Sequence, residues 1–416
     1  MSLEKFDVVV AGTGAVGMST ALWAQKSGLK VAICDPQPAG SGASYGVACT
    51  ISTYACVPIN SPTIFKSLPA LLFSKNSPLS FDFLFGLKNM GWMLSFLSNC
   101  RRSKVEHITQ SLGELLAHTD EGLDPLIAEC GAEDLFVQNG CLYVWSTKAG
   151  YDAAQAGNDM RLKLGIEFEV LEPHEILELE PSLKMPMYRG VLFKGARHTV
   201  DPQAYVTRMY DRFIELGGVA ISSTINEVLP NTDAVTVQLD HNRTLHSDHV
   251  VVAAGAHSKS IQGSGAETLP LGVELGYHVA FKDHAEKVSR PVGWAEAGLY
   301  ATPTAHGLRI AGTVEINSIT APSNTARLDY LRERAKQMFG ELDGDQDIWR
   351  GCRPTMPDSL PVIGHSRGSD RIFNAFGHQH IGLTLSGITG RILTDLIQNK
   401  EPVANLSAFS DKRFKK

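Results

Sequence analysis

The sequence predicts an α/β fold of two interleaved domains, one built on a Rossmann-type parallel sheet and one on a mixed sheet. Three observations predict this fold class. Residues 5–35 read as a strand, a glycine turn, a helix and a second strand, in that order. Strand and helix signals then alternate to the end of the chain without a low-complexity linker. With 416 residues, the chain is also longer than the ~250–300 residues at which a single core stops growing.

The first motif lies in "KFDVVVAGTGAVGMSTALWAQKSGLKVAICD", residues 5–35, where we expect a strand at 6–11, a helix at 15–27 and a strand at 30–34. Glycines spaced G-x-G-x-x-G permit a tight turn, close approach of a pyrophosphate and close helix packing. The N–H groups that open the helix face the phosphates, and an acid that ends the second strand binds ribose hydroxyls. The sequence therefore predicts an adenine-dinucleotide site at Gly12, Gly14, Ala15, Val16, Gly17 and Asp35.

Further elements follow along the chain. Apolar spacing predicts helices at 104–128, 148–164, 203–217 and 326–339. The sequence "LFVQNGCLYVW" predicts a hairpin over 135–145 that turns at Asn139-Gly140. Strand-like runs cover 219–228, 234–240, 249–258, 277–283 and 299–314, and the last pattern is a strand at 371–376 followed by a helix at 385–398.

Composition narrows the class of protein. A net charge of −6 and the lack of a basic stripe argue against a nucleic-acid partner. The seven cysteines include no C-x-x-C pair and no zinc spacing, which predicts reduced thiols, no metal site and a cytoplasmic protein. The N-terminal apolar run lacks a basic segment before it, so we expect no signal peptide.

Residues 64–97 form the most apolar stretch of the chain. Three lysines and an aspartate interrupt it, so we expect no membrane-spanning helix there. We favour a core-facing or interface helix. The alternative is peripheral contact with the inner face of the cytoplasmic membrane.

The rest of the chain favours FAD over a nicotinamide dinucleotide. A small-residue loop, "GSGASYGVACTIS" at 40–52, follows the second strand where a nicotinamide domain would continue with another helix. Near the C-terminus, "NAFGHQHIGLTLSGITGRILTDLI" at 374–397 is a strand, a glycine loop and a helix. The N-terminus of that helix offers N–H groups and a positive dipole end to an anion such as a reduced flavin.

With these motifs in place, the chain resembles the D-amino-acid oxidase superfamily of FAD enzymes, and within it is most similar to the bacterial D-amino-acid dehydrogenase branch. The resemblance runs from Phe6 to about Ile397 and is carried by "ASYGVACTIS", "VVVAAGAHS", "GLRIAGTVE" and "GCRPTMPDSLPVIG". It implies noncovalently bound FAD. Besides the glycine motif, it places FAD against Ser44, Tyr45, Val228, Ala254, Gly255, Gly351, Gly377, Gly382, Leu383 and Thr384.

The resemblance also implies an arginine that binds the substrate's carboxylate, and this role falls on Arg353. A planar guanidinium matches a carboxylate with two parallel hydrogen bonds. The alternative is a structural ion pair with Asp358. In "PLGVELGYHV", Leu275 stands where relatives often carry arginine, and we favour Tyr277 over His278 as a substrate contact.

Other residues near the expected site carry two interpretations each. His378 and His380 either lie near flavin and substrate or are bonded within the protein. Tyr300 is expected as an aromatic wall, and Arg309 as a second cation or a surface residue. Cys352 is either a packed residue or, as in some sarcosine oxidases, a point of covalent flavin attachment.

The function implied is oxidation of a D-amino acid or cyclic D-imino acid to an imine, which water hydrolyses to a keto acid and ammonia. Electrons would pass to a quinone or another acceptor. One alternative is an oxygen-using glycine- or sarcosine-type oxidase, although no lysine of the kind that sarcosine oxidases use is recognisable. An alternative of another class is an FAD domain in tRNA modification, which the acidic charge argues against.

Motif placement predicts the domain division. We expect an FAD-binding domain from residues 1–65, 195–275 and 345–416, and a substrate domain from 66–194 and 276–344, whose mixed sheet covers the flavin.

Overall fold

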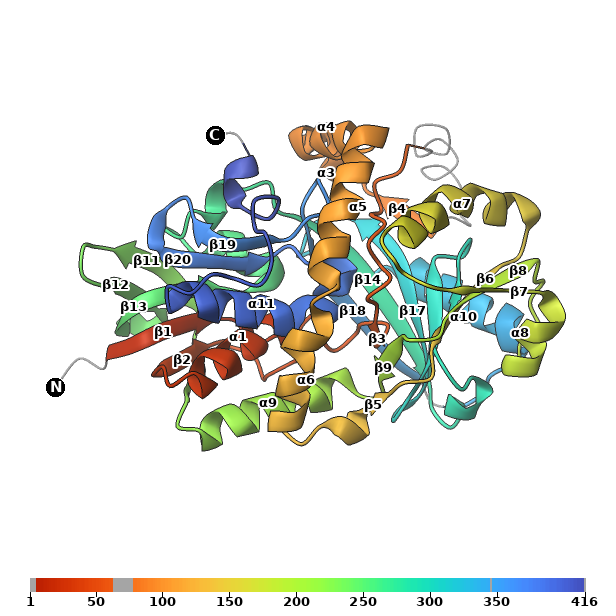
Figure 1. The fold of residues 1–416 in the computed structure, drawn as a ribbon, viewed down its shortest axis with the longest axis horizontal. Helices are drawn as coiled ribbons and strands as arrows, with labels where there is room; N and C mark the ends of the chain where they lie inside the picture. The colour runs from red at the N-terminus through yellow and green to blue at the C-terminus, as the bar shows by residue number, and fades with distance from the viewer. Residues whose placement is uncertain (1–4, 63–77, 345, 415–416) are drawn as a thin grey trace.

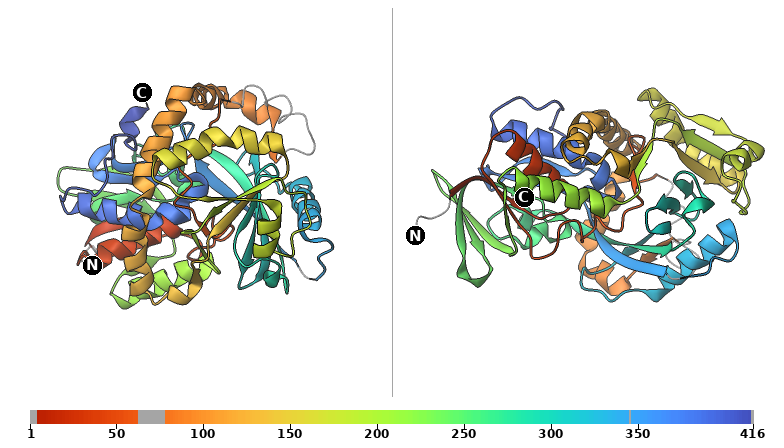
Figure 2. Two further views of the ribbon diagram at one scale, coloured as in Figure 1. Left: turned by 45° about the vertical axis from the view of Figure 1, so that its right-hand side comes forward. Right: turned by 90° about the horizontal axis from the view of Figure 1, so that it is seen from below.

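A computed structural model describes residues 5–62, 78–344 and 346–414. Two large sheets lie on opposite sides of the molecule, with helices packed around and between them (Figures 1 and 2). The α/β fold predicted from the sequence is confirmed.

The first sheet is the Rossmann-type sheet, and its centre is parallel. Strand β1 lies between β2 and β13, and β13 in turn pairs with β20. Because parallel strands need crossovers, the chain returns to this sheet from far along the sequence. The parallel strands in spatial order are β10 (Val219–Ile221), β2 (Val31–Cys34), β1 (Lys5–Ala11), β13 (Thr244–Val252) and β20 (Ser369–Phe376). The antiparallel additions are β11 (Ile225–Pro230), β12 (Val235–Leu239) and β19 (Val362–Ser366).

Helices cover one face of this sheet and bury its alternate residues. α1 (Ala15–Lys26) packs against α11 (Gly382–Ile397) and α9 (Pro202–Glu215), as Figure 1 shows. Val8 and Val10 of β1 point into this helical layer, and Phe6 and Val9 point to the opposite face. Gly390 permits the close α1–α11 contact, since a Cβ there would lie 2.7 Å from the backbone of Ser19.

The second sheet is mixed and has nine strands. Three neighbouring strands at one side of it, β18, β14 and β17, carry most of the residues that concern the site. In spatial order the strands are β18 (Gln346–Thr355), β14 (Gly272–Phe281), β17 (Gly307–Ile316), β16 (Leu299–Thr304), β15 (Val292–Trp294), β6 (Cys141–Trp145), β8 (Arg189–Phe193) and β7 (Glu169–Leu171), with β4 (Leu79–Phe81) beside β17. α10 (Thr325–Phe339) covers one face, and Leu275, Tyr277, Val279 and Phe281 of β14 point into that core.

Smaller elements connect the two sheets. β3 (Thr50–Ile51), β9 (Arg197–Thr199) and β5 (Phe136–Val137) form a three-stranded sheet. The remaining helices are α3 (Phe83–Lys88), α4 (Met90–Asn99), α5 (Arg102–Leu116), α6 (Thr119–Glu129), α7 (Lys148–Lys163) and α8 (Pro173–Leu179). No helix among the described residues is long and apolar enough to cross a membrane.

Three sequence predictions are corrected by the structure. The hairpin over 135–145 is wrong, because β5 pairs with β9 while β6 pairs with β8 and β15 in another sheet. The helix expected at 104–128 is two helices, α5 and α6, with a break at Ala117 and His118. The strand expected at 219–228 is likewise two strands, since β10 ends at Ile221 and β11 begins at Ile225.

The predicted domain division stays a prediction. Strands of the Rossmann-type sheet come from residues 5–34, 219–252 and 362–376. β18, at 346–355, belongs to the nine-stranded sheet although its residues were assigned to the FAD-binding segment. The apolar stretch 64–97 and the boundary at 65 lie in part outside the described residues.

Candidate active site

The turn between β1 and α1 is built by glycines that leave no room for a side chain. Gly12 has a φ of +105°, and a Cβ there would lie 2.5 Å from the carbonyl oxygen of Ala253. A Cβ on Gly17 would lie 1.9 Å from the carbonyl oxygen of Gly12. Gly14 and Val16, in contrast, stay partly exposed. The glycines therefore bring β1, β13 and α1 together and leave the start of α1 accessible, as the sequence predicted.

Two side chains from other segments hold this turn. The Thr13 N–H donates to Oδ2 of Asp35 over 2.8 Å, and the Gln37 N–H donates to Oδ1 over 2.8 Å. The Ala15 N–H donates to Oγ of Ser44 over 2.9 Å. Each carboxylate oxygen keeps a second lone pair, so Asp35 retains acceptor capacity for a ribose hydroxyl at the carboxyl end of β2.

The end of β13 lies beside this turn. The Ala253 N–H donates to the carbonyl of Ala11, and the next two residues, Ala254 and Gly255, are partly exposed. Val228 is placed differently from the prediction. Its side chain is fully buried in β11, and its N–H donates to the carbonyl of Gln262. Val228 therefore has neither an exposed side chain nor a free N–H with which to contact a cofactor.

The N-terminus of α11 forms a second place where backbone donors open into the site. The helix begins at Gly382, three residues earlier than predicted, and no side chain caps it. Thr384 accepts a hydrogen bond from the Ser52 N–H over 2.9 Å, which joins the helix start, including Leu383, to the small-residue loop. Nε2 of Gln379, in the loop before the helix, is buried without a hydrogen-bond partner. Gly377, with a φ of +84°, lets this loop pack on Met356.

Arg353 lies flat across the sheet, over a glycine. A Cβ on Gly276 would lie 2.4 Å from Cζ of Arg353, so only glycine permits this position. Nη1 donates to the carbonyl of Thr313 over 2.9 Å, and Arg353 as a residue is partly exposed. Trp349 lies flat in the same way, since Cβ atoms on Gly351 or Gly46 would each lie 1.9 Å from its indole.

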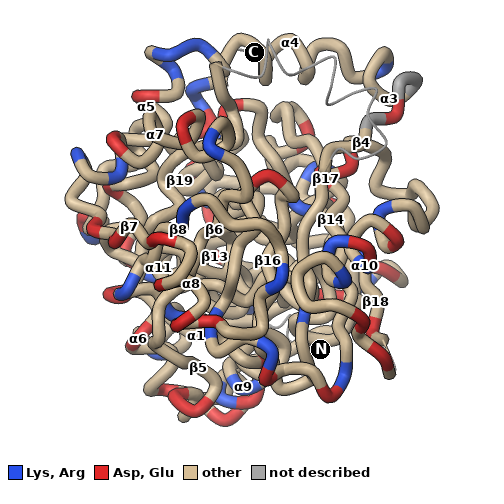
Figure 3. The backbone as a smooth tube through the Cα atoms, turned by 90° about the vertical axis from the view of Figure 1, so that its right-hand side faces the viewer, with Lys and Arg blue, Asp and Glu red and all other residues tan. Residues whose placement is uncertain are grey.

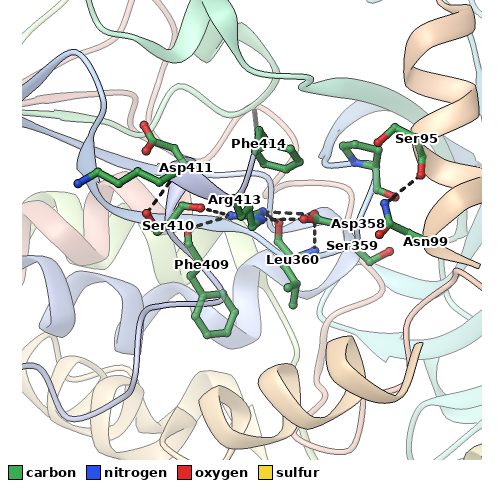
Figure 4. Close-up of polar contacts among 12 residues, drawn as sticks. Ser95, Asn99, Asp358, Ser359, Leu360, Phe409, Ser410, Asp411, Arg413 and Phe414 are labelled. Atoms are coloured by element: carbon green, nitrogen blue, oxygen red, sulfur yellow. Dashed lines mark hydrogen bonds and ion pairs between the residues drawn. The ribbon is translucent and has the colours of Figure 1, made fainter. Parts of the chain in front are cut away.

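The alternative role for Arg353, an ion pair with Asp358, is wrong. Asp358 binds Arg413 instead, with Nε to Oδ2 at 2.7 Å, as Figure 4 shows. Arg413 also donates to the carbonyls of Phe409, Ser410 and Leu360, so its donors are used on the C-terminal segment and on this loop. Among the residues that the structure describes, no carboxylate forms an ion pair with Arg353.

The carboxylate across from Arg353 is Glu274, which the sequence analysis missed. The two residues are paired across β14 and β18, and Glu274 is 4% exposed. Burial raises the pKa of Glu274 to about 7, and the Arg353 charge opposes that rise. Burial lowers the pKa of Arg353, which the Glu274 charge opposes. Near neutral pH the guanidinium thus has an incompletely ionised neighbour and is disposed to accept an anionic ligand.

Tyr277 points away from this site, which corrects the preference for Tyr277 over His278. Its side chain is fully buried in the core under α10, where its hydroxyl donates to Glu315 over 2.6 Å and accepts from the Asn324 N–H. Because strand residues alternate, Glu274, Gly276 and His278 share the opposite face. His278 stacks on Trp349 with ring centroids 5.5 Å apart, so the site face carries His278 rather than Tyr277.

The two histidines before α11 differ in their surroundings. His378 is buried, and its Nε2 lies 3.0 Å from Oγ1 of Thr389, as in the structural alternative. Burial lowers its pKa to about 3. His380 is exposed, yet the surrounding protein lowers its pKa to about 4, with the Arg353 charge adding to the effect.

Arg309 and Tyr45 tie the small-residue loop to the nine-stranded sheet. Arg309 is 1% exposed, so it is no surface residue, and its Nη1 donates to the carbonyl of Tyr45 over 2.8 Å. The Tyr45 hydroxyl donates to Asp347 over 2.5 Å, and Asp347 lies 3.5 Å from Nε2 of His278. Cys352 packs with the core under α10, on the face away from Arg353.

Together these features fit an extended dinucleotide that carries a planar ring system. The cradle at Gly12 to Gly17, the acid at Asp35 and the uncapped start of α11 are the places where backbone donors and an acceptor remain available. The buried, unpartnered Nε2 of Gln379 indicates a hydrogen-bond acceptor beyond the protein's own atoms. The class of protein that these features fit is a dinucleotide-dependent oxidoreductase.

Comparison with known proteins identifies the family. The family model "FAD dependent oxidoreductase" (DAO) matches residues 7–396, so the chain belongs to the DAO family and its cofactor is FAD. A D-amino-acid oxidase of Bradyrhizobium diazoefficiens is 32% identical over 98% of each chain. A D-amino acid dehydrogenase of Allorhizobium ampelinum is 26% identical over 95% of each chain.

Solved structures agree on the fold. Glycine oxidase from Geobacillus kaustophilus superposes with a TM-score of 0.75 at 20% identity, over 99% of this chain and 100% of that one. L-proline dehydrogenase from P. horikoshii superposes with a TM-score of 0.74 at 17% identity, over 99% of this chain and 98% of that one. The resemblance stated from the sequence is confirmed.

Proposed function

We propose that this protein oxidises a D-amino acid or cyclic D-imino acid and passes the electrons to a quinone-type acceptor. The observation that carries the proposal is Arg353, a partly exposed residue whose guanidinium lies over Gly276 and has no ion-pair partner among the described residues. A substrate carboxylate would supply that partner with two parallel hydrogen bonds. The names of the relatives, D-amino-acid oxidase and D-amino acid dehydrogenase, support the amine and its handedness.

The protein's own residues have the tasks of binding and orienting. Arg353 holds the carboxylate, and Gly276 keeps the guanidinium flat so that the substrate lies along the sheet. His380 is neutral near pH 7, because its pKa is about 4, so it adds no charge that would hold the substrate amine. FAD, when bound, supplies the acceptor for a hydride from the substrate's α-carbon. No side-chain base is required if the amine is neutral, and water hydrolyses the released imine.

The proposal also names the electron acceptor, a quinone dissolved in a membrane. α3 and α4 expose Leu87, Met90 and Leu94 to 49%, 45% and 60%. Figure 3 shows α4 without a charged residue, and α5 then begins with exposed basic side chains, Arg101, Arg102 and Lys104. An apolar face beside basic residues suits an anionic membrane surface, where a quinone is dissolved. α4 also contacts the nine-stranded sheet, because Trp92 packs against Gly272 at the start of β14.

Oxygen as acceptor is the second candidate. It is favoured by the name of the 32% identical relative, a D-amino-acid oxidase.

Anaerobic flavin bleaching tests the proposal. The purified protein would be mixed with D- and L-amino acids, D-proline, hydroxyproline isomers, glycine and sarcosine while the flavin band at ~450 nm is followed. We expect bleaching by D-amino or D-imino acids, fast reoxidation by a quinone and slow peroxide formation in air. Bleaching by none of them would overturn the proposed reaction, and fast stoichiometric peroxide would replace the quinone with oxygen.

Sedimentation with vesicles tests the membrane contact. We expect the holoprotein to bind vesicles that contain anionic lipid and not neutral ones, and Leu94→Gln to weaken binding while activity with a soluble dye is unchanged. Equal binding of the variant would remove α4 from the proposal.

A further inference from the structure

We propose that the hydroxyl groups of Tyr143 and Tyr300 form the far wall of the substrate site and select an uncharged side chain that carries a hydrogen-bonding oxygen. This inference rests on the proposed function, because it names the substrate class for that same site. The two hydroxyls are hydrogen-bonded to each other.

Strand pairing places the two tyrosines on the same face as the site. Residues paired directly across neighbouring strands point to the same side of a sheet. One such row crosses the nine-stranded sheet from β6 to β18, and its members are Tyr143, Gly293, Tyr300, Ala311, His278 and Trp349. The tyrosines therefore share the sheet face of His278 and Trp349, beside which the Arg353 guanidinium lies.

The row also carries small residues between its aromatic members. Ala311 lies between Tyr300 and His278, and Gly293 lies between the two tyrosines. Arg353 donates to the carbonyl of Thr313, two residues beyond Ala311 on β17. With strands ~4.8 Å apart and a rise of ~3.3 Å per residue, Tyr300 starts roughly 8 Å from that carbonyl. A substrate whose carboxylate is held by Arg353 would thus extend its side chain toward the tyrosines.

Accessibility supports a wall of the same site. Tyr143 and Tyr300 are partly exposed, yet burial raises the pKa of both phenols. His380 and Arg353 show the same combination of accessibility and a pKa shifted by burial. Tyr143 and Tyr300 therefore lie where protein surrounds them closely and solvent still reaches them.

Hydrogen-bond accounting distinguishes this pair from the tyrosine next to it. The Tyr54 hydroxyl donates to Sγ of Cys141 over 3.1 Å and accepts from Ser52, so its proton is used. In the Tyr143–Tyr300 pair only one of the two hydroxyl protons is used, because one hydroxyl donates and the other accepts. Within the described part of the chain, neither hydroxyl has a further partner. The pair therefore offers one donor to a ligand oxygen.

The surroundings of the pair exclude charge. Tyr143 packs edge-on against Tyr54 and Phe193, with ring centroids 6.1 Å away in each case. The cation of this region, Arg161, donates to the carbonyl of Tyr54 and to Asn158. A cationic substrate side chain would be buried there beside Arg161 without an opposite charge, which is costly. The wall suits an apolar side chain that ends in, or carries, a hydroxyl or carbonyl oxygen.

Matched substrate pairs test the inference on the holoenzyme. We would measure kcat/KM for D-threonine against D-valine, D-tyrosine against D-phenylalanine, and 4-hydroxy-D-proline against D-proline. We expect a preference for the hydroxylated member in the pair whose length reaches the wall. Tyr143→Phe or Tyr300→Phe should reduce that preference roughly 3- to 10-fold, the value of one neutral hydrogen bond, with little change for the unhydroxylated member.

A matched control and a binding measurement keep the two proposals apart. Tyr330→Phe removes a hydroxyl that donates to Ala297 under the opposite face of the sheet, and should leave the preference unchanged. Binding of 4-hydroxyphenylacetate against phenylacetate, followed by flavin absorbance, needs no turnover. If 4-hydroxyphenylacetate binds more tightly than phenylacetate, this difference depends on the tyrosines, and no substrate is oxidised, the wall is supported and the proposed reaction is overturned. If the Tyr143→Phe/Tyr300→Phe variant oxidises the substrates with unchanged preferences and binds the two ligands in an unchanged ratio, the wall is overturned and the proposed reaction stands.

Discussion

The turn at Gly12 to Gly17 and the substrate face at Arg353 build their binding surfaces in different ways. In the turn, the binding groups are backbone N–H groups of neighbouring residues, and the tightest packing contact, Gly17 on Gly12, spans five residues. On the substrate face, side chains from β14, β16, β17 and β18 meet only because those strands are paired. The turn therefore depends on having no side-chain volume at its glycines. The substrate face depends on the chemical groups of its side chains and on the register in which its strands pair.

The largest expected effect is at the turn. Gly17→Ala places a methyl group 1.9 Å from the Gly12 carbonyl oxygen, so β1 and α1 must separate and the cradle for the phosphates is lost. We expect a protein that is purified without flavin, measured by absorbance at ~450 nm and by flavin release. Gly42→Ala is the control, because nothing lies within 4 Å of its Cβ position. A yellow Gly17→Ala protein would contradict the assignment of this turn as the cradle.

The next effect separates the substrate face from the turn. Arg353→Met should lower kcat/KM on the order of 10²- to 10⁴-fold, because it removes the charged partner of the substrate carboxylate. Flavin content should be unchanged. Arg353→Lys keeps the charge without the planar fork, and we expect an intermediate value. If Arg353→Met lost the flavin while the turn variants kept it, the roles of the two regions would be reversed.

The smallest effect is a pH dependence confined to the substrate face. The pKa of Glu274 is raised to about 7 from an ordinary 4.5, so the protonated form stabilises the fold below that ordinary value and the contribution is lost as pH rises through 7. Once ionised, Glu274 competes with the substrate carboxylate for Arg353. His380 does not titrate in this window, because its pKa is about 4.

A carboxylate without an amine, such as benzoate, isolates this effect from titration of the substrate. We expect its dissociation constant to rise several-fold as pH rises through 7, and Glu274→Gln to flatten the profile. The Thr355 hydroxyl, which donates to the carbonyl of Arg353, is left in place by this change. An unchanged profile in Glu274→Gln would show that the carboxylate does not titrate against Arg353.

The two regions also differ in how far the sequence predicts them. The glycine turn, Asp35 and the helix after it were predicted within one or two residues, because local sequence determines a βαβ unit. Arg353 was found through its "GCRP" motif. The sequence did not show which face of β14 lines the site, and Tyr277 was preferred over His278. Strand residues point alternately to the two faces, and the pattern alone does not tell which face a helix such as α10 covers. Glu274 was missed because its partner across the strand is 79 positions away in sequence.

The hairpin predicted at Asn139-Gly140 failed for a related reason. The turn signal is real, with Gly140 at a φ of +88°, but strands 136–137 and 141–145 leave it for different sheets. A local turn preference does not determine which strands pair. In "ELGYH", Glu274 and His278 are an even number of positions apart, so a strand there places both on the same face. That spacing would have pointed to the two residues together.

The contacts of Arg413 with the loop that follows Arg353 have a consequence for the order in which the chain folds. Asp358 and Leu360, which follow Arg353 in the sequence, are bound by Arg413, close to the end of the described chain. The Rossmann-type sheet is likewise complete only when β20 has paired with β13. A nascent chain can form its glycine turn early, whereas the loop that follows Arg353 gains its contacts with Arg413 only once residue 413 has left the ribosome.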